Sequence, residues 1–253
     1  HEIYANPVVK QVAFEIRFPN LFFIETRIGE FQVEVMGDFP QSELVHRRSF
    51  MFVAGNPDNK SIDDLAKQQA NDSTDKIWQF KSLTGTKLEI SSRNLVLSSG
   101  EHRSYKNGEE PTFRTLIKRV VDPFLKMVQL AIVLRIGFRY TNECPIFDRS
   151  TERFNQCYNS ILPMSRFRLG EVANMDCAVV ASAKDCQYRH LESMRLTPQG
   201  GTLVLDIDAW SENVQVEKVM DVTDLLYETI SNDFKSTIKE PIIDFMRKPK
   251  GGS

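Results

Sequence analysis

Two aspartates separated by one residue, Asp206 and Asp208, lie where apolar and polar residues alternate. Successive side chains of a strand point to opposite faces, so a strand here directs both carboxylates to one face and Leu205 and Ile207 to the other. Two such carboxylates with a third acidic ligand form an oxygen set with which Mg²⁺ can assist phosphoester hydrolysis. Glu15, on the polar face of an earlier predicted strand, is the best candidate for that third ligand.

Arginines on predicted strands carry the opposite charge. Arg135 and Arg139 share one face of residues 133–142, and Arg17 lies on the polar face of residues 11–18. A planar guanidinium binds phosphate or carboxylate through two parallel hydrogen bonds, so these arginines suit a floor that binds a small anionic ligand. Cross-strand ion pairs with the three carboxylates above are the alternative, and the equal numbers of opposite charges favour it. Both arrangements use the same side chains: Glu15, Arg17, Arg135, Arg139, Asp206 and Asp208.

The histidines and cysteines match no motif for catalysis or metal binding. No Cys-x-x-Cys pair occurs, so we expect reduced thiols rather than disulfides or a zinc site at Cys144, Cys157, Cys177 and Cys186. The sequence contains no Gly-x-Ser-x-Gly, no His-Glu-x-x-His and no glycine-rich phosphate loop. The sequence therefore assigns no catalytic residue, no metal and no cofactor.

The composition is that of an ordinary globular protein. Of 253 residues, 41% are hydrophobic and 26% are charged, and the net charge of −2 provides no overall attraction to nucleic acid or anionic lipid. Short basic clusters such as Arg47-Arg48 leave nucleic-acid binding as a weak alternative, because no exposed aromatic residues are interleaved with them. No apolar run approaches the roughly 20 residues that cross a bilayer. The sequence predicts a soluble, cytoplasmic protein with no membrane partner.

The elements that must position these side chains begin with a half-buried strand over residues 11–18. Apolar residues at helical spacing then predict helices over residues 24–36 and 112–130, and Pro123 predicts a kink or a break in the second helix. Between these helices we expect a strand, a loop and a meander of three short strands, over residues 44–54, 55–76 and 78–98 respectively.

The second half of the chain repeats this order less regularly. Helical spacing predicts a helix over residues 151–162 and a long amphipathic helix over residues 222–238, followed by a short apolar segment over residues 242–246. The strands between the two helices are expected over residues 167–171, 175–183, 187–197 and 202–210.

These elements together predict an α+β fold with two antiparallel meander sheets, each covered by a long amphipathic helix. The similar order of elements in both halves raises a two-lobed pseudo-repeat as a hypothesis, although the halves share no residue-level identity. The expected division is an N-terminal β-meander and helix lobe over residues 1–148, a C-terminal lobe of the same kind over residues 149–248, and a flexible tail over residues 249–253.

Several short segments, read together, form a recognisable pattern along most of the chain. They are Asn6-Pro7-Val8-Val9, Phe14-Glu15-Ile16-Arg17-Phe18, Phe39-Pro40, Trp78-Gln79-Phe80, the arginine-rich residues 135–142, and Leu205-Asp206-Ile207-Asp208. With these segments the chain resembles a family of uncharacterised prokaryotic proteins that is sporadically distributed among genomes. The resemblance implies a soluble, cytoplasmic protein from a mobile or accessory set of genes, and it supplies no catalytic residues.

A charged face between strands, without a complete catalytic set, predicts a non-enzymatic binding or interaction module of an accessory prokaryotic system. We expect a protein partner or self-association, for which a homodimer is the simplest form, and a small anionic ligand is a further candidate. Two alternatives stay open. One is a metal-dependent phosphoester hydrolase or nucleotide-handling enzyme in which Arg135 and Arg139 clamp phosphate, and the other is a nucleic-acid-binding protein.

Overall fold

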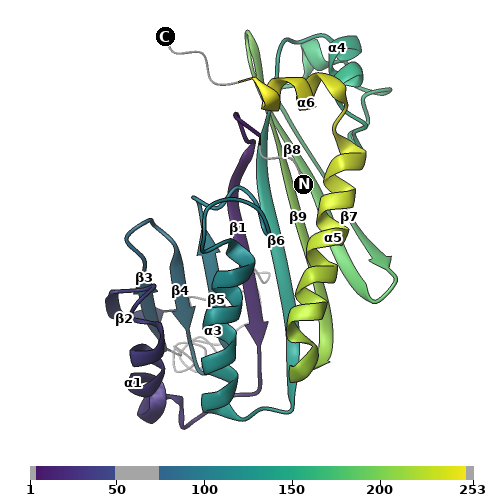
Figure 1. Cartoon of the computed structure of the whole chain (residues 1–253). Helices are drawn as coiled ribbons and strands as arrows, with labels where there is room; N and C mark the ends of the chain where they lie inside the picture. Colours follow the sequence, from purple (N-terminus) through teal and green to yellow (C-terminus); the bar gives the residue numbers. More distant parts are fainter. Residues whose placement is uncertain (1–3, 49–73, 249–253) are drawn as a thin grey trace, which may run out of the picture.

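A computed structural model describes residues 4–48 and 74–248 of the chain. Within them the chain forms a nine-stranded antiparallel sheet with the order β2-β3-β4-β5-β1-β6-β9-β8-β7 (Figure 1). The strands are β1 (Val9–Arg17), β2 (Gln41–Arg48), β3 (Thr74–Lys81), β4 (Lys87–Ile90), β5 (Asn94–Ser99), β6 (Ile132–Ile146), β7 (Asn174–Ala183), β8 (Cys186–Thr197) and β9 (Gly200–Gln215). The helices are α1 (Ile24–Val35), α3 (Phe113–Val128), α4 (Thr151–Cys157), α5 (Val219–Thr237) and α6 (Glu240–Arg247). The predicted α+β class is confirmed.

The two predicted meander sheets are one continuous sheet, because β1, β6 and β9 pair at its centre. β6 spans 15 residues and pairs on one side with β1 and on the other side, along its whole length, with β9. Alternation of apolar residues shows which side chains share a face of a strand, but it does not show which strands are neighbours. The prediction of two separate sheets is therefore wrong. The lobe boundary between residues 148 and 149 and the pseudo-repeat stay predictions.

The helices lie on one face of the sheet (Figure 1). That face presents the apolar side chains of the central strands, among which Phe14, Ile16 and Phe138 are fully buried. α5 contacts β6, β8 and β9, while α3 contacts α1 and places the ring of Phe124 with its centroid 5.1 Å from that of Phe18. Burial of each such Phe or Ile contributes roughly 1.5–3 kcal/mol, so this layer holds the main core and leaves the opposite sheet face to polar side chains.

α3 runs as one helix through Pro123, so of the two predicted alternatives the break is wrong and the kink stays a prediction. A proline inside a helix removes one hydrogen bond and crowds the preceding turn. Val120, Val121 and Phe124 beside it are buried in the main core, and this packing holds the helix together across the missing bond.

The strand predicted over residues 167–171 is instead a short 3₁₀ helix, Leu169–Glu171. Its first backbone N–H donates to the hydroxyl of Thr151 at 3.0 Å. The guanidinium of Arg149 donates to three carbonyl groups of residues 169–172. Side chains therefore satisfy the backbone groups that a neighbouring strand would otherwise have to satisfy.

Some sequence predictions fall outside the described residues. Residues 49–54 of the predicted strand over 44–54 and residues 55–73 of the predicted loop over 55–76 lie outside the described residues. The predicted tail over 249–253 lies outside them as well. None of the helices in the described ranges has both the length and the apolar character needed to span a bilayer.

Candidate functional site

Alternation along β1, β6 and β9 places the six charged residues on the sheet face opposite the helices. The strand register sets Arg139 directly across from Asp208, and Glu15 directly across from Gly137. The residues between them in sequence, such as Phe138 and Ile207, are fully buried on the helix side. The six side chains therefore share one surface, which we call the open face.

Arg135 is the centre of the open face. Its Nη1 donates to Oε2 of Glu15 at 2.7 Å, its Nη2 donates to Oδ2 of Asp208 at 3.2 Å, and its guanidinium carbon lies 5.3 Å from the ring centroid of Trp210. The side chain folds over Gly137, where a Cβ atom would come within 2.8 Å of Nη1. A glycine at this position thus leaves room for one guanidinium to join carboxylates from two strands.

The other arginines of the open face also have carboxylate partners. Arg139 donates from Nε and Nη2 to the two carboxylate oxygens of Asp206, each at 2.6 Å, and Arg189 of β8 lies 4.0 Å from the same carboxylate. Arg17 Nε lies 3.0 Å from Oε1 of Glu15. These hydrogen bonds to carboxylates raise the pKa values of Arg17 and Arg139 above their ordinary value.

The open face is an ionic network between strands, of the kind that the sequence favoured. Burial raises the pKa of Asp208 above its ordinary value, although Arg135 and Arg139 act in the opposite direction. The side chain of Asp206 is 6% exposed, whereas that of Arg139 is 53% exposed, so the pair stands at the boundary with water. Exposed pairs contribute about 0.2–1 kcal/mol each, and their main effect is to fix the register of β1, β6 and β9. Binding of an anion on this face stays a prediction.

The hydrolase alternative requires Glu15, Asp206 and Asp208 to present free oxygens together. Each of these carboxylates accepts hydrogen bonds from an arginine instead. In residues 4–48 and 74–248, His, Cys, Asp and Glu side chains form no group of three or more arranged to hold a metal ion. The geometry therefore gives no support to a metal centre at these three residues.

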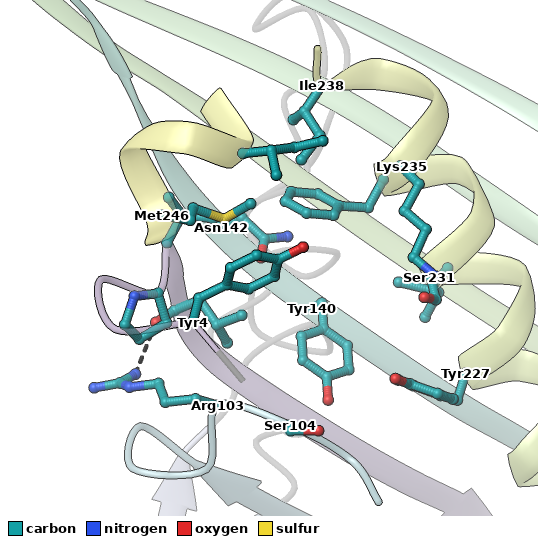
Figure 2. Close-up of a pocket in the computed structure, with 16 residues that line it drawn as sticks. Tyr4, Arg103, Ser104, Tyr140, Asn142, Tyr227, Ser231, Lys235, Ile238 and Met246 are labelled. Carbon is teal, nitrogen blue, oxygen red and sulfur yellow. Dashed lines mark hydrogen bonds between the residues drawn. The ribbon is translucent and has the colours of Figure 1, made fainter. Parts of the chain in front are cut away.

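A cavity of about 340 Å³ lies on the helix side, between β1, β6, α5 and α6. Its apolar wall includes Val8 and Phe234. Ile238 and Met246 belong to the same wall (Figure 2). The segment 4–9 and α6 close it together, because the backbone N–H of Asn6 donates to the carbonyl of Met246 at 2.8 Å. Its volume lies at the lower end of the range of small-molecule sites, roughly 300–1,000 Å³.

Polar side chains also line the cavity, and they include Tyr4, Asn142 and Ser231 (Figure 2). Ser104 and the phenol rings of Tyr140 and Tyr227 line one part of it, and Arg103 and Lys235, both largely exposed, stand at its rim (Figure 2). Arg103 donates from Nη1 to the carbonyl of Val9 at 2.7 Å. Among the described residues that line the cavity, none is an aspartate or a glutamate. The lining therefore combines apolar side chains and hydroxyl groups with positive charge.

A larger and shallower hollow, of about 770 Å³, lies beside the turn 82–86 and the loop 101–112. Its histidine, His102, is held by the hydroxyl of Ser99 at 2.8 Å and by the carbonyl of Pro111 at 3.1 Å. We give this hollow no ligand, because its histidine is engaged with the chain itself.

A buried charged cluster joins β8 to α5. His190, 5% exposed, lies 2.5 Å through Nδ1 from Asp233 and 3.1 Å through Nε2 from Glu192, which is fully buried. Glu192 also accepts hydrogen bonds from the Ser160 hydroxyl and from the backbone N–H of Ile161. Burial by itself lowers the pKa of His190, but the hydrogen bonds to the two carboxylates outweigh it and raise the pKa to about 9.

This cluster is a charged anchor in the core rather than a catalytic triad. In a triad the serine hydroxyl bonds to the imidazole, whereas Ser160 bonds to Glu192 and leaves the imidazole between two carboxylates. The sequence analysis overlooked the cluster. A signal was present, since His190 and Glu192 interrupt an alternating face that otherwise carries residues such as Cys186 and Met194.

No protein-family model matches the chain, and a search of curated proteins gives no match either. The candidate site is therefore defined by its geometry alone, and we take it to be the cavity, with the open face as a second region.

Proposed function

We propose that this protein is a binding module without a catalytic step of its own, and that it holds a small organic anion with an apolar body in the cavity. The observation that carries the proposal is the composition of the cavity wall. Most of its surface is apolar, hydroxyl groups and one amide interrupt it, and two cations but no carboxylate occur among its described lining residues. Largely apolar pockets with a few convergent polar groups suit small molecules, and cations at the rim attract anions before contact.

The melting temperature of the purified protein tests this proposal. We expect a rise of roughly 5–10 °C with amphipathic organic anions at a hundredfold excess over Kd, since binding to the folded state alone stabilises it by about 2.7 kcal/mol. Cationic molecules of the same apolar size should give smaller rises. A rise with nucleotides and Mg²⁺ alone would favour the hydrolase alternative, and no rise with any organic anion would contradict the proposal.

We also propose the accessory, prokaryotic and cytoplasmic role that the family resemblance implies, together with self-association as a homodimer. An edge strand supports self-association, because β7 ends the sheet and exposes 45% of Val179 and 62% of Val180. An unpaired strand edge is a template for pairing with another strand. Light scattering over a range of concentrations tests this, and the mass of a single chain throughout would contradict it.

A further inference from the structure

One side of the β7 backbone has no neighbouring strand among the described residues. β7 ends the sheet and pairs with β8 along its whole length, with no shift of register. Just before β7, the carbonyl of Ala173 accepts a hydrogen bond of 3.0 Å from the N–H of Leu196. The N–H and C=O groups of an antiparallel strand point alternately to one side and to the other. Those of the even-numbered residues 176–182 therefore point to the outer edge of the sheet.

The sequence of this edge does not protect it against pairing with another strand. Residues 177–183 contain no charge and no proline, and Val180 at their middle is 62% exposed. Folded proteins commonly protect edge strands with charged side chains, prolines or bulges. β2, at the other edge, has such protection, because Glu43 and His46 are exposed along it. The hairpin of β7 and β8 also reaches beyond α5, which leaves the outer edge of β7 uncovered (Figure 1).

The sequence of β7 is complementary to itself when two copies run antiparallel. Asp176 lies near its start and Lys184 directly follows its end, and both are exposed. With a two-fold axis at Val180, Asp176 of each copy lies opposite Lys184 of the other. An axis one residue to either side leaves both charges opposite uncharged residues. Opposite charges directly across a strand pair stabilise it, so charge complementarity favours a second copy of this chain as the partner.

We propose that two copies of the chain associate by antiparallel pairing of their β7 strands about a two-fold axis at Val180. The inference rests on the self-association proposed above and assigns its surface and its symmetry. The outward N–H and C=O groups of residues 176–182 then bond to those of the second copy. Because the axis is perpendicular to the sheet, the two sheets become one, with both open faces on one side and the helices of both copies on the other.

Sedimentation equilibrium of the parent protein and of Val180→Lys tests the surface. In the variant two positive charges face each other across the axis, so we expect the dissociation constant of the dimer to rise about tenfold or more. Val180 is exposed in the single chain, so the variant should keep its fold, which circular dichroism checks. The matched control is Leu44→Lys, the same substitution at a half-exposed apolar residue of the other edge strand, which should leave the dissociation constant unchanged.

Charge reversal tests the register. Asp176→Lys and Lys184→Asp each place like charges opposite each other twice in the dimer, so each should raise the dissociation constant about fivefold. The double variant exchanges the two charges and should return to within about twofold of the parent protein. Within one chain the two residues lie roughly 25 Å apart along the strand, so this recovery must arise between copies.

Cysteine variants give a second measure of the register. Val180→Cys should form a disulfide-linked dimer on mild oxidation, because directly opposed Cα atoms are about 5.5 Å apart, a distance that a disulfide bridges. The control Ser182→Cys lies opposite Ala178, and its two copies are roughly 13 Å apart along the strands, too far for a disulfide. Gel electrophoresis without reductant measures both variants, and the parent protein shows the contribution of the native thiols.

The outcomes separate this inference from the self-association on which it rests. A dimer that persists unchanged in Val180→Lys would overturn pairing through β7 and leave self-association through another surface. Failure of the double charge variant to recover, or a disulfide in Ser182→Cys instead of Val180→Cys, would overturn the axis at Val180. The mass of a single chain at every concentration of the parent protein would overturn the pairing and the proposed self-association together, and ligand binding in the cavity is independent of both.

Discussion

Arg139 and Tyr140 are neighbours in β6, yet their side chains lie on opposite faces of the sheet. The charged groups on one face have partners, whereas the Tyr140 hydroxyl on the other has none among the described residues. Arg139 lies on the open face, where each of the six charged residues has an ion-pair partner. Tyr140 enters the cavity, where its hydroxyl has no hydrogen-bond partner within the described residues. The charges of the open face suggest a binding site in the sequence, but in the structure they form ion pairs that hold neighbouring strands together. Buried hydroxyl groups without a partner are rare in folded proteins, so the cavity side of β6 is the less satisfied of the two regions.

The buried cluster of His190, Glu192 and Asp233 extends this comparison to the core and gives the largest expected effect. His190→Ala leaves Glu192 buried without its cation, so the free energy of unfolding should fall by about 3–5 kcal/mol in urea denaturation. The double variant His190→Leu with Glu192→Leu removes both charges and should recover at least half of that loss. A single variant as stable as the parent protein would show that the cluster contributes nothing.

The same histidine predicts a dependence of stability on pH. Its pKa is about 9 in the folded protein, against an ordinary value of about 6.5, so folding favours the protonated form. Its contribution of about 3 kcal/mol is therefore fully present below pH 6.5 and is lost as the pH rises through 9. Urea unfolding between pH 6 and pH 10 measures it, with His190→Ala as the control that should lack this component.

On the open face we expect a smaller effect. Arg135→Met removes the two hydrogen bonds to Glu15 and Asp208 and should lower the free energy of unfolding by about 1–3 kcal/mol. The matched control is Arg189→Met, because Arg189 is half-buried and lies 4.0 Å from Asp206. Its effect should stay below about 0.5 kcal/mol. Equal losses in both variants would contradict a network centred on Arg135.

The smallest effects should differ in sign between the two tyrosines. Tyr140→Phe removes an unpartnered hydroxyl, so stability in the absence of ligand should stay unchanged or rise by up to about 1 kcal/mol. Tyr158→Phe removes a hydrogen bond to Pro145 and should cost about 1 kcal/mol. Calorimetric melting of both variants measures the difference. A clear loss of stability in Tyr140→Phe would mean that the hydroxyl has a partner and would remove the contrast between the two regions.

Local patterns in the sequence were enough to predict much of the open face. Alternation around Glu15, Arg135 and Asp206 shows that these side chains leave the apolar face of their strands, and the opposite charges indicate that they pair. The helical spacing of residues 222–238 likewise matches α5, Val219–Thr237. These features depend on periodicity within one element, which a sequence contains directly.

Features that depend on which elements meet could not be predicted in this way. One central ladder joins the two halves because β6 pairs with both β1 and β9, and no residue in β6 specifies its neighbours by itself. The cavity needs Tyr140 from β6 and Tyr227 from α5 together with residues near both ends of the described chain. The residues that line the cavity follow no regular spacing in the sequence, because only the packing of separate elements brings them together.

The closure of the cavity by both ends of the described chain has a consequence for how the protein assembles. The Asn6 to Met246 hydrogen bond joins two segments that lie far apart in the sequence, so the second is made long after the first. A chain still emerging from the ribosome without residues 238–246 lacks one wall, so it should acquire ligand only after α6 has docked. Bound ligand would then indicate that α6 has docked, and amide exchange in residues 4–9 should slow when ligand is bound.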